Sequence, residues 1–72
     1  MKTVLVFKTS VLEEQQIRKL RPLLNKLVNR YGCWNFDLED CDNILRVETQ
    51  NLHACSISSL LEKNGYRCEE LH

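Results

Sequence analysis

The sequence predicts a single α+β domain whose elements follow in the order strand, helix, strand, strand, helix, strand. Three observations support this prediction. Seventy-two residues leave room for one core, two segments carry apolar residues at helical spacing, and four short segments have the composition of strands. Two right-handed crossovers wound into one antiparallel sheet give the ferredoxin-like βαββαβ plait, a four-stranded sheet with two helices on one face, and we expect it to span residues 1–72.

The first strand is expected over residues 2–8, where β-branched and aromatic residues are concentrated. If its alternation places Leu5 and Phe7 toward the helices, Val4 and Val6 lie on the open side of the sheet. The opposite register, which exchanges these two sides, is the alternative. The apolar run is shorter than a secretory leader needs, and no segment is long enough to span a membrane. A cytoplasmic protein without a membrane partner is therefore expected.

A long amphipathic helix follows, after the hydroxyl side chains of Thr9 and Ser10, which can cap a helix. Its apolar stripe comprises Ile17, Leu20, Leu24, Leu27, Val28 and Tyr31. Pro22 lies inside this pattern, where it lacks an N–H and crowds the carbonyl of Arg18. The sequence therefore predicts either a kink at Pro22 or a helix that starts there, ending in both cases at Gly32.

A hairpin comes next. Residues 33–39 alternate between apolar and polar, which predicts a half-buried strand with Trp34 and Phe36 on its inner face together with Leu38. The turn 40–43 consists of Asp, Cys, Asp and Asn, residues that favour turns because their side chains bond their own backbone. A second strand is expected over 44–48.

The chain ends in a second helix and a last strand. Residues 52–64 carry apolar side chains at helical spacing and end at Gly65, and a strand is expected over 66–71. Each helix has a single apolar stripe, so both helices are expected to cover the same face of the sheet.

Two segments resemble a known family. The run 57–66, ISSLLEKNGY, resembles the second helix and terminal Gly-Tyr of the heavy-metal-associated domain, a small copper-chaperone-like module, and residues 34–39 resemble its second strand. The resemblance covers almost the whole chain and implies the ferredoxin-like fold. In that family a loop after the first strand carries Cys-x-x-Cys, which binds Cu(I) or another soft metal. The corresponding segment here, 8–17, has no Cys, His or Met, so the metal activity is not implied and no cofactor is expected.

The four cysteines support an alternative function. They are Cys33, Cys41, Cys55 and Cys68, and none forms a Cys-x-x-Cys pair. With the strand order 4-1-3-2, Cys33 and Cys68 lie on opposite edges, about 14 Å apart, too far for a disulfide or one shared Zn²⁺. Free thiols are expected. The alternative is a soft-metal protein that binds or traffics Cu(I) or Zn²⁺ through these cysteines, outside the usual loop.

The charge balance and the absence of known motifs argue against several functions. Ten basic and ten acidic residues cancel, so the chain has no general attraction to nucleic acid. The third strand lacks the aromatic residues that stack on RNA bases. The chain has no paired carboxylates, triad or phosphate loop, and His53 beside Cys55 has no residue to orient it, so we expect no enzyme.

Charged residues also form two clusters. The basic cluster on the first helix comprises Arg18, Lys19, Arg21, Lys26 and Arg30, and the acidic cluster at the hairpin comprises Asp37, Glu39, Asp40 and Asp42. Each is either a solvated surface or a patch for a charged partner or for self-association.

Together these observations predict a non-catalytic cytosolic interaction domain. The expected contact surface comprises Val4, Val6, Ile44 and Arg46, on the side of the sheet that the helices leave open. The partner would be another protein or a second copy of the chain.

Overall fold

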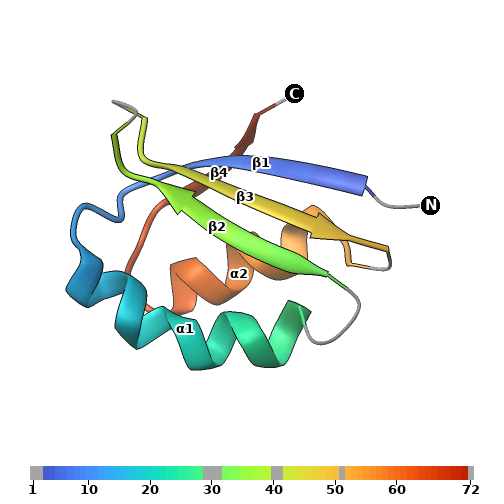
Figure 1. Ribbon diagram of the computed structural model, residues 1–72, viewed down its shortest axis with the longest axis horizontal. Coiled ribbons are helices and arrows are strands. Elements are labelled where there is room, and N and C mark those ends of the chain that lie inside the picture. Colours follow the sequence, from blue (N-terminus) through green and yellow to red (C-terminus); the bar gives the residue numbers. More distant parts are fainter. Residues whose placement is uncertain (1–2, 29–31, 40–41, 51, 72) are drawn as a thin grey trace.

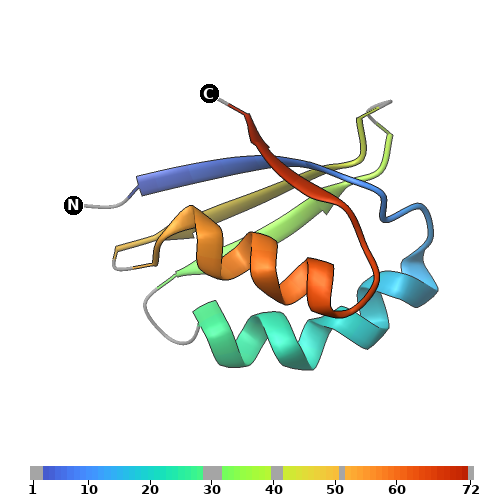
Figure 2. The same ribbon diagram turned by 180° about the vertical axis from the view of Figure 1, so that it is seen from behind.

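The computed structural model describes residues 3–28, 32–39, 42–50 and 52–71. Its elements are β1 (Thr3–Thr9), α1 (Glu14–Val28), β2 (Cys33–Asp37), β3 (Ile44–Thr49), α2 (Ala54–Lys63) and β4 (Cys68–Leu71). Four antiparallel strands form one sheet in the order β2-β3-β1-β4, and both helices lie against the same face (Figures 1 and 2). The predicted fold class is confirmed.

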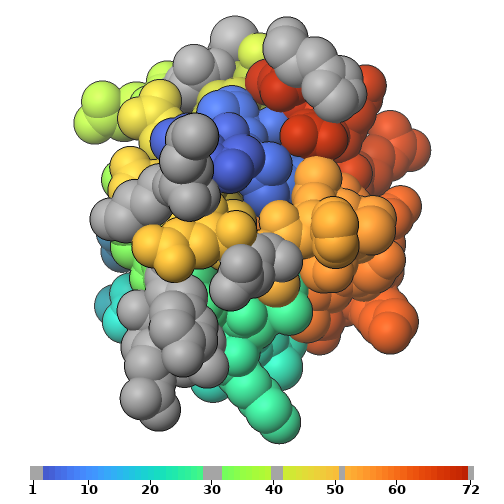
Figure 3. Space-filling view, turned by 90° about the vertical axis from the view of Figure 1, so that its right-hand side faces the viewer, coloured from blue at the N-terminus to red at the C-terminus, as the bar shows by residue number. Residues whose placement is uncertain are grey.

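The core lies between the sheet and the two helices. Its buried apolar residues are Leu5, Phe7, Val11, Leu20, Leu24, Val28, Leu45, Val47, Ile57 and Leu61. Seen from the end at which β1 begins, β1 lies above the last turns of α1 and beside α2 (Figure 3). Of the two registers that the sequence left open for β1, the structure has the one in which Leu5 and Phe7 are buried, whereas Val4 is 53% exposed.

The start of α1 differs from the sequence-based expectation. Thr9 and Ser10 do not cap the helix, because Thr9 ends β1 and its hydroxyl donates to the Asn43 carbonyl at 2.7 Å. The Ser10 hydroxyl oxygen accepts the backbone N–H of Arg67 at 2.8 Å. Instead, the Gln16 side-chain oxygen accepts the N–H groups of Leu12 (2.7 Å) and Glu13 (3.2 Å), as in one half of a capping box.

Pro22 lies within α1, which runs unbroken from Glu14 to Val28. The alternative prediction, a helix that starts at Pro22, is therefore wrong. Pro22 and Arg18 are both exposed, so the proline interrupts hydrogen bonding on the side of the helix that faces solvent, where the Arg18 carbonyl is open to hydration.

The end of α2 explains why the last strand begins later than expected. The N–H of Tyr66 donates to the Leu61 carbonyl (3.0 Å) and that of Gly65 to the Glu62 carbonyl (3.1 Å), a Schellman pair. Gly65 has φ 88°, which glycine adopts without strain. Because Tyr66 is engaged at the helix end, β4 starts at Cys68, paired with Thr9.

No helix within the described ranges is both long enough and apolar enough to cross a membrane.

Candidate functional site

One side of the sheet is left uncovered by both helices, and we call it the open face (Figure 1). The strand registers place eleven residues on it. They are Val4, Val6 and Lys8 of β1; Cys33, Asn35 and Asp37 of β2; Ile44, Arg46 and Glu48 of β3; and Glu69 and Leu71 of β4.

The structure brings the four predicted contact residues together on the open face. Val6 lies directly opposite Arg46, with Val4 and Ile44 on either side along the same two strands. Leu71, which the sequence reasoning missed, lies opposite Val6 on β4 and is 39% exposed. An alternation only four residues long did not fix which side of β4 faces solvent.

Charges of both signs surround this apolar centre. Lys8 Nζ lies 3.6 Å from Asp42 Oδ1, an ion pair with both side chains about half exposed. Such exposed pairs contribute under about 1 kcal/mol. Two cations, Lys8 and Arg46, share the open face with the carboxylates of Asp37, Glu48 and Glu69. The open face therefore carries both positive and negative side chains. Asp42, which belongs to the acidic cluster at the hairpin, lies next to this face and pairs with Lys8.

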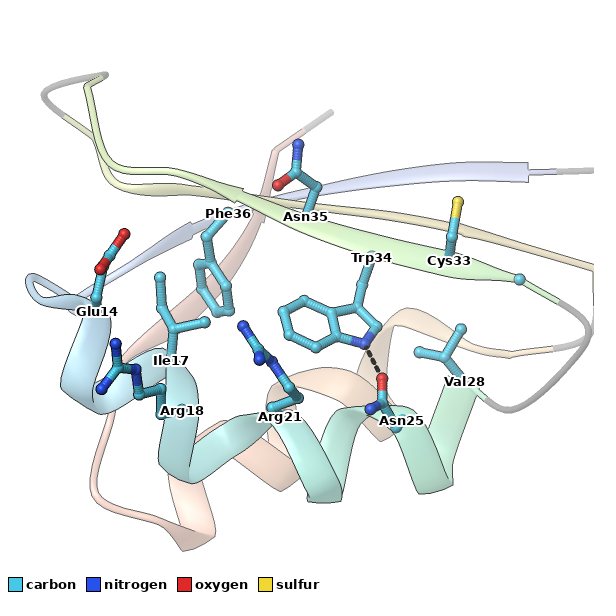
Figure 4. Close-up of a pocket in the computed structure, with 11 residues that line it drawn as sticks. Glu14, Ile17, Arg18, Arg21, Asn25, Val28, Cys33, Trp34, Asn35 and Phe36 are labelled. Carbon is cyan, nitrogen blue, oxygen red and sulfur yellow. Dashed lines mark hydrogen bonds between the residues drawn. The ribbon is translucent and has the colours of Figure 1, made fainter.

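A second surface feature lies between α1 and β2, and we call it the α1–β2 groove (Figure 4). It encloses about 650 Å³, with Ile17, Arg18 and Arg21 on the helix side and Trp34 and Phe36 on the strand side. The rings of Trp34 and Phe36 pack edge to face, with their centroids 5.9 Å apart. Beyond Phe36 a second hollow of about 500 Å³ continues along β2, sharing Ile17 and Phe36 with the first.

Trp34 is held in place across this groove. Its indole N–H donates to the side-chain oxygen of Asn25 on α1, at 2.8 Å (Figure 4). In the same view the side chain of Arg21 extends from α1 toward β2, between the side chains of Trp34 and Phe36. The groove thus combines an aromatic wall with cationic side chains.

The described cysteines are dispersed. Cys33 and Cys68 lie on the opposite edge strands β2 and β4, as predicted, and Cys55 is exposed on α2. No disulfide joins these three, and Cys41 lies outside the described residues. The Cys33 thiol donates to the Glu48 carboxylate at 3.6 Å. Among the residues that the structure describes, no group of three or more His, Cys, Asp or Glu side chains is arranged to hold a metal ion.

The remaining candidate residues that the structure describes are exposed. His53 occupies the N-cap position of α2 without a side-chain cap bond and faces solvent. In the acidic cluster, the Asp37 carboxylate accepts the backbone N–H of Glu39 at 3.2 Å. The exposed residues of the basic helix include Lys19 and Lys26. Asp40 and Arg30 lie outside the described residues.

Cys68 differs from the two exposed thiols. Its pKa is raised from 9.0 to about 11, mainly because burial disfavours the thiolate; a hydrogen bond with Ser58 opposes this rise and the nearby Glu62 carboxylate adds to it. In the unfolded chain Cys68 ionises near pH 9, whereas in the folded chain it stays neutral to about pH 11. Its contribution to stability is therefore complete below pH 9 and is lost as the pH rises through 11.

We expect slow alkylation of Cys68 in the folded protein. At pH 8 the raised pKa lowers its thiolate fraction about 100-fold, and the greater nucleophilicity of a more basic thiolate recovers about tenfold. Iodoacetamide should therefore modify Cys68 about tenfold more slowly in native buffer than in guanidinium, as followed by peptide mass spectrometry. Cys55, exposed on α2, is the internal reference for reagent access. Equal native and denatured rates at Cys68 would contradict its burial.

Comparisons of the chain with protein-family models, with curated proteins and with solved structures find no match.

Proposed function

We propose that this chain is a non-catalytic interaction domain that binds a second copy of itself through the open face. The observation that carries the proposal is the apolar centre of that face, formed by Val4, Val6, Ile44 and Leu71. Val4 and Leu71 are 53% and 39% exposed. An apolar patch with a polar rim on an uncovered sheet favours burial against another protein surface.

The charge distribution favours a second copy as the partner. The whole chain has a net charge of zero, so two copies do not repel each other. A symmetric interface must be complementary to itself, and the open face offers both signs of charge for this purpose. A strongly anionic partner, such as nucleic acid or an acidic membrane, would meet three carboxylates on this face.

The proposal includes the resemblance to the heavy-metal-associated domain, without its metal activity. In the segment that corresponds to the family's metal loop, the polar side chains of Thr9, Ser10 and Gln16 are already hydrogen-bonded to the backbone. Soft metals select thiolate and thioether ligands, which this segment lacks. The exposed free thiols of Cys33 and Cys55 support a location in the reducing cytoplasm.

Replacing Val4 with lysine tests the dimer. We expect the wild-type chain to dimerise reversibly and Val4→Lys to weaken the dimer at least about tenfold, because an ammonium group would have to leave water in the interface. The variant should fold normally, since the new cation lies opposite Glu48 on β3. Sedimentation velocity over a dilution series measures both association constants.

The matched control is Leu12→Lys, because Leu12 is 67% exposed and lies outside the sheet. It should leave the dimer unchanged. A wild-type chain that is monomeric at every concentration, or an equal loss in both variants, would refute the open face as the contact.

Native mass spectrometry with Zn²⁺ or Cu(I) tests the alternative function. The proposed dimer should form regardless of either metal. Stoichiometric uptake that disappears when the four cysteines become serine would instead favour a soft-metal protein.

A further inference from the structure

We propose that the α1–β2 groove binds an extended acidic peptide, which adds as a further strand to the free edge of β2. This surface lies at one edge of the sheet, and of its described lining residues only Cys33 and Asn35 also belong to the open face. The proposal therefore goes beyond dimerisation and does not depend on it.

One edge of β2 is free to pair with another strand. Within the described part of the chain β2 pairs with β3 alone, so its other side has no strand beside it. On that side, alternate residues of β2 direct their backbone N–H and C=O groups outward. An extended peptide can satisfy these groups through main-chain hydrogen bonds.

The α1–β2 groove lies beside that free edge. Trp34 and Phe36 project from β2 toward α1, where Ile17 completes an apolar wall. A peptide strand added to β2 would direct every second side chain into this space. The volume of about 650 Å³ is within the range of ligand pockets and accommodates several such side chains.

The helix side of the groove is positively charged. Arg18 and Arg21 are exposed on the groove side of α1, and neither forms an ion pair with a described carboxylate. Residues three apart on a helix have Cβ atoms about 5–6 Å apart. Alternate residues of a strand are about 6.6 Å apart, so acidic residues at positions i and i+2 of a bound peptide match the two guanidinium groups.

The other edge of the sheet gives the opposite signal. The edge strand β4 carries Glu69 and Glu70, which would repel an acidic strand, whereas Glu14 is the one carboxylate among the described residues that line the main groove. Asp37 and Glu39 line only the second hollow, beyond Phe36. An acidic peptide is therefore directed to the part of β2 that faces Arg18 and Arg21.

Peptide titration tests the proposal. The probe is Thr-Glu-Thr-Glu-Thr-Val-Thr, whose two glutamates and valine share one face. Trp34, the single tryptophan of the chain, reports binding through its fluorescence. We expect saturable binding, weakened about fivefold by Arg21→Gln and unchanged by the matched variant Lys19→Gln, since one partly exposed ion pair contributes up to about 1 kcal/mol. Lys19 is exposed on the same helix and does not line the groove.

Modified peptides separate strand addition from simple charge attraction. Glutamine in place of both glutamates should weaken binding more than tenfold, the product of two such pairs. Two further peptides are N-methylated at alternate residues, one at the odd and one at the even positions. One of them should lose binding and the other should keep it, because only one of these two sets of N–H groups faces β2.

Three results would overturn the proposal. They are no binding of the acidic peptide, equal binding of the glutamine peptide, and equal loss in the Arg21 and Lys19 variants. The Val4→Lys variant, altered only on the open face, should bind the peptide like the wild type, so failure of the dimer and failure of the groove are distinguishable.

Discussion

Replacing Phe7 with alanine is expected to destabilise the domain more than any other single truncation on β1. Phe7 is 0% exposed and lies at the centre of the sheet, between Leu45 of β3 and Glu70 of β4. Loss of a buried phenylalanine ring typically costs about 3–5 kcal/mol. A domain of this size has a total stability of roughly 4–11 kcal/mol, so the variant should be largely or wholly unfolded near physiological temperature.

Urea denaturation followed by far-ultraviolet circular dichroism measures this effect. The midpoint should fall sharply without a change in the slope of the transition. Val4→Ala is the matched control, because Val4 lies on the same strand and faces away from the core at 53% exposure. It should cost less than about 1 kcal/mol. Similar losses in the two variants would mean that β1 does not present opposite faces to core and solvent.

The two sides of β1 show which features the sequence could predict. Alternation in a strand depends on neighbouring residues alone, so the sequence could place Leu5 and Phe7 on one side of β1 and Val4 on the other. Which side faces the helices depends on how the sheet packs, and the sequence left both registers open. The separation of Cys33 and Cys68 was also predictable, because it follows from the strand order, which βαββαβ connectivity largely determines.

The α1–β2 groove was not predicted. In the sequence, Arg18 and Arg21 belong to a charged helix surface, and Trp34 and Phe36 belong to the inner face of a strand. Only the packing of α1 beside the edge strand β2 brings these groups together, and that packing depends on contacts between residues distant in the chain. A signal was present, since β2 is an edge strand in the expected order and carries the only tryptophan.

The errors at the start of α1 have a similar cause. Thr9 and Ser10 have the side chains of helix caps, but tertiary contacts use their hydroxyls to hold Asn43 and Arg67. Local propensity is a weak prior that such contacts override. The helix instead uses Gln16, whose position three residues after Glu13 fits the capping pattern.

A second large effect is expected for Gly32→Ala. A Cβ atom on Gly32 would collide with the carbonyl oxygen of Glu48 and lie 3.1 Å from the Cα of Thr49. Both are backbone atoms of β3, so no side-chain rotation relieves the clash and the start of β2 must move away from β3. Overpacking typically costs about 1–3 kcal/mol, and an immovable backbone neighbour places this variant at or above the upper end.

Gly65→Ala provides the comparison, because the two glycines are required for different reasons. At Gly65 an added Cβ meets nothing within 4 Å, and the cost comes only from φ 88°, about 1–2 kcal/mol for a residue with a side chain. Urea denaturation should therefore rank Gly32→Ala below Gly65→Ala in stability. The reverse order would mean that β2 does not approach β3 as closely as the structure has it.

The same displacement should also alter the groove. Gly32 immediately precedes β2, and Trp34 lies two residues further on, bonded to Asn25 of α1. Moving the start of β2 would break this indole hydrogen bond and expose the ring, so the fluorescence of Trp34 should shift to longer wavelength in Gly32→Ala and stay unchanged in Gly65→Ala. If strand addition to β2 is correct, Gly32→Ala should also lose affinity for the acidic peptide under conditions where it remains folded, because the edge that receives the peptide has moved.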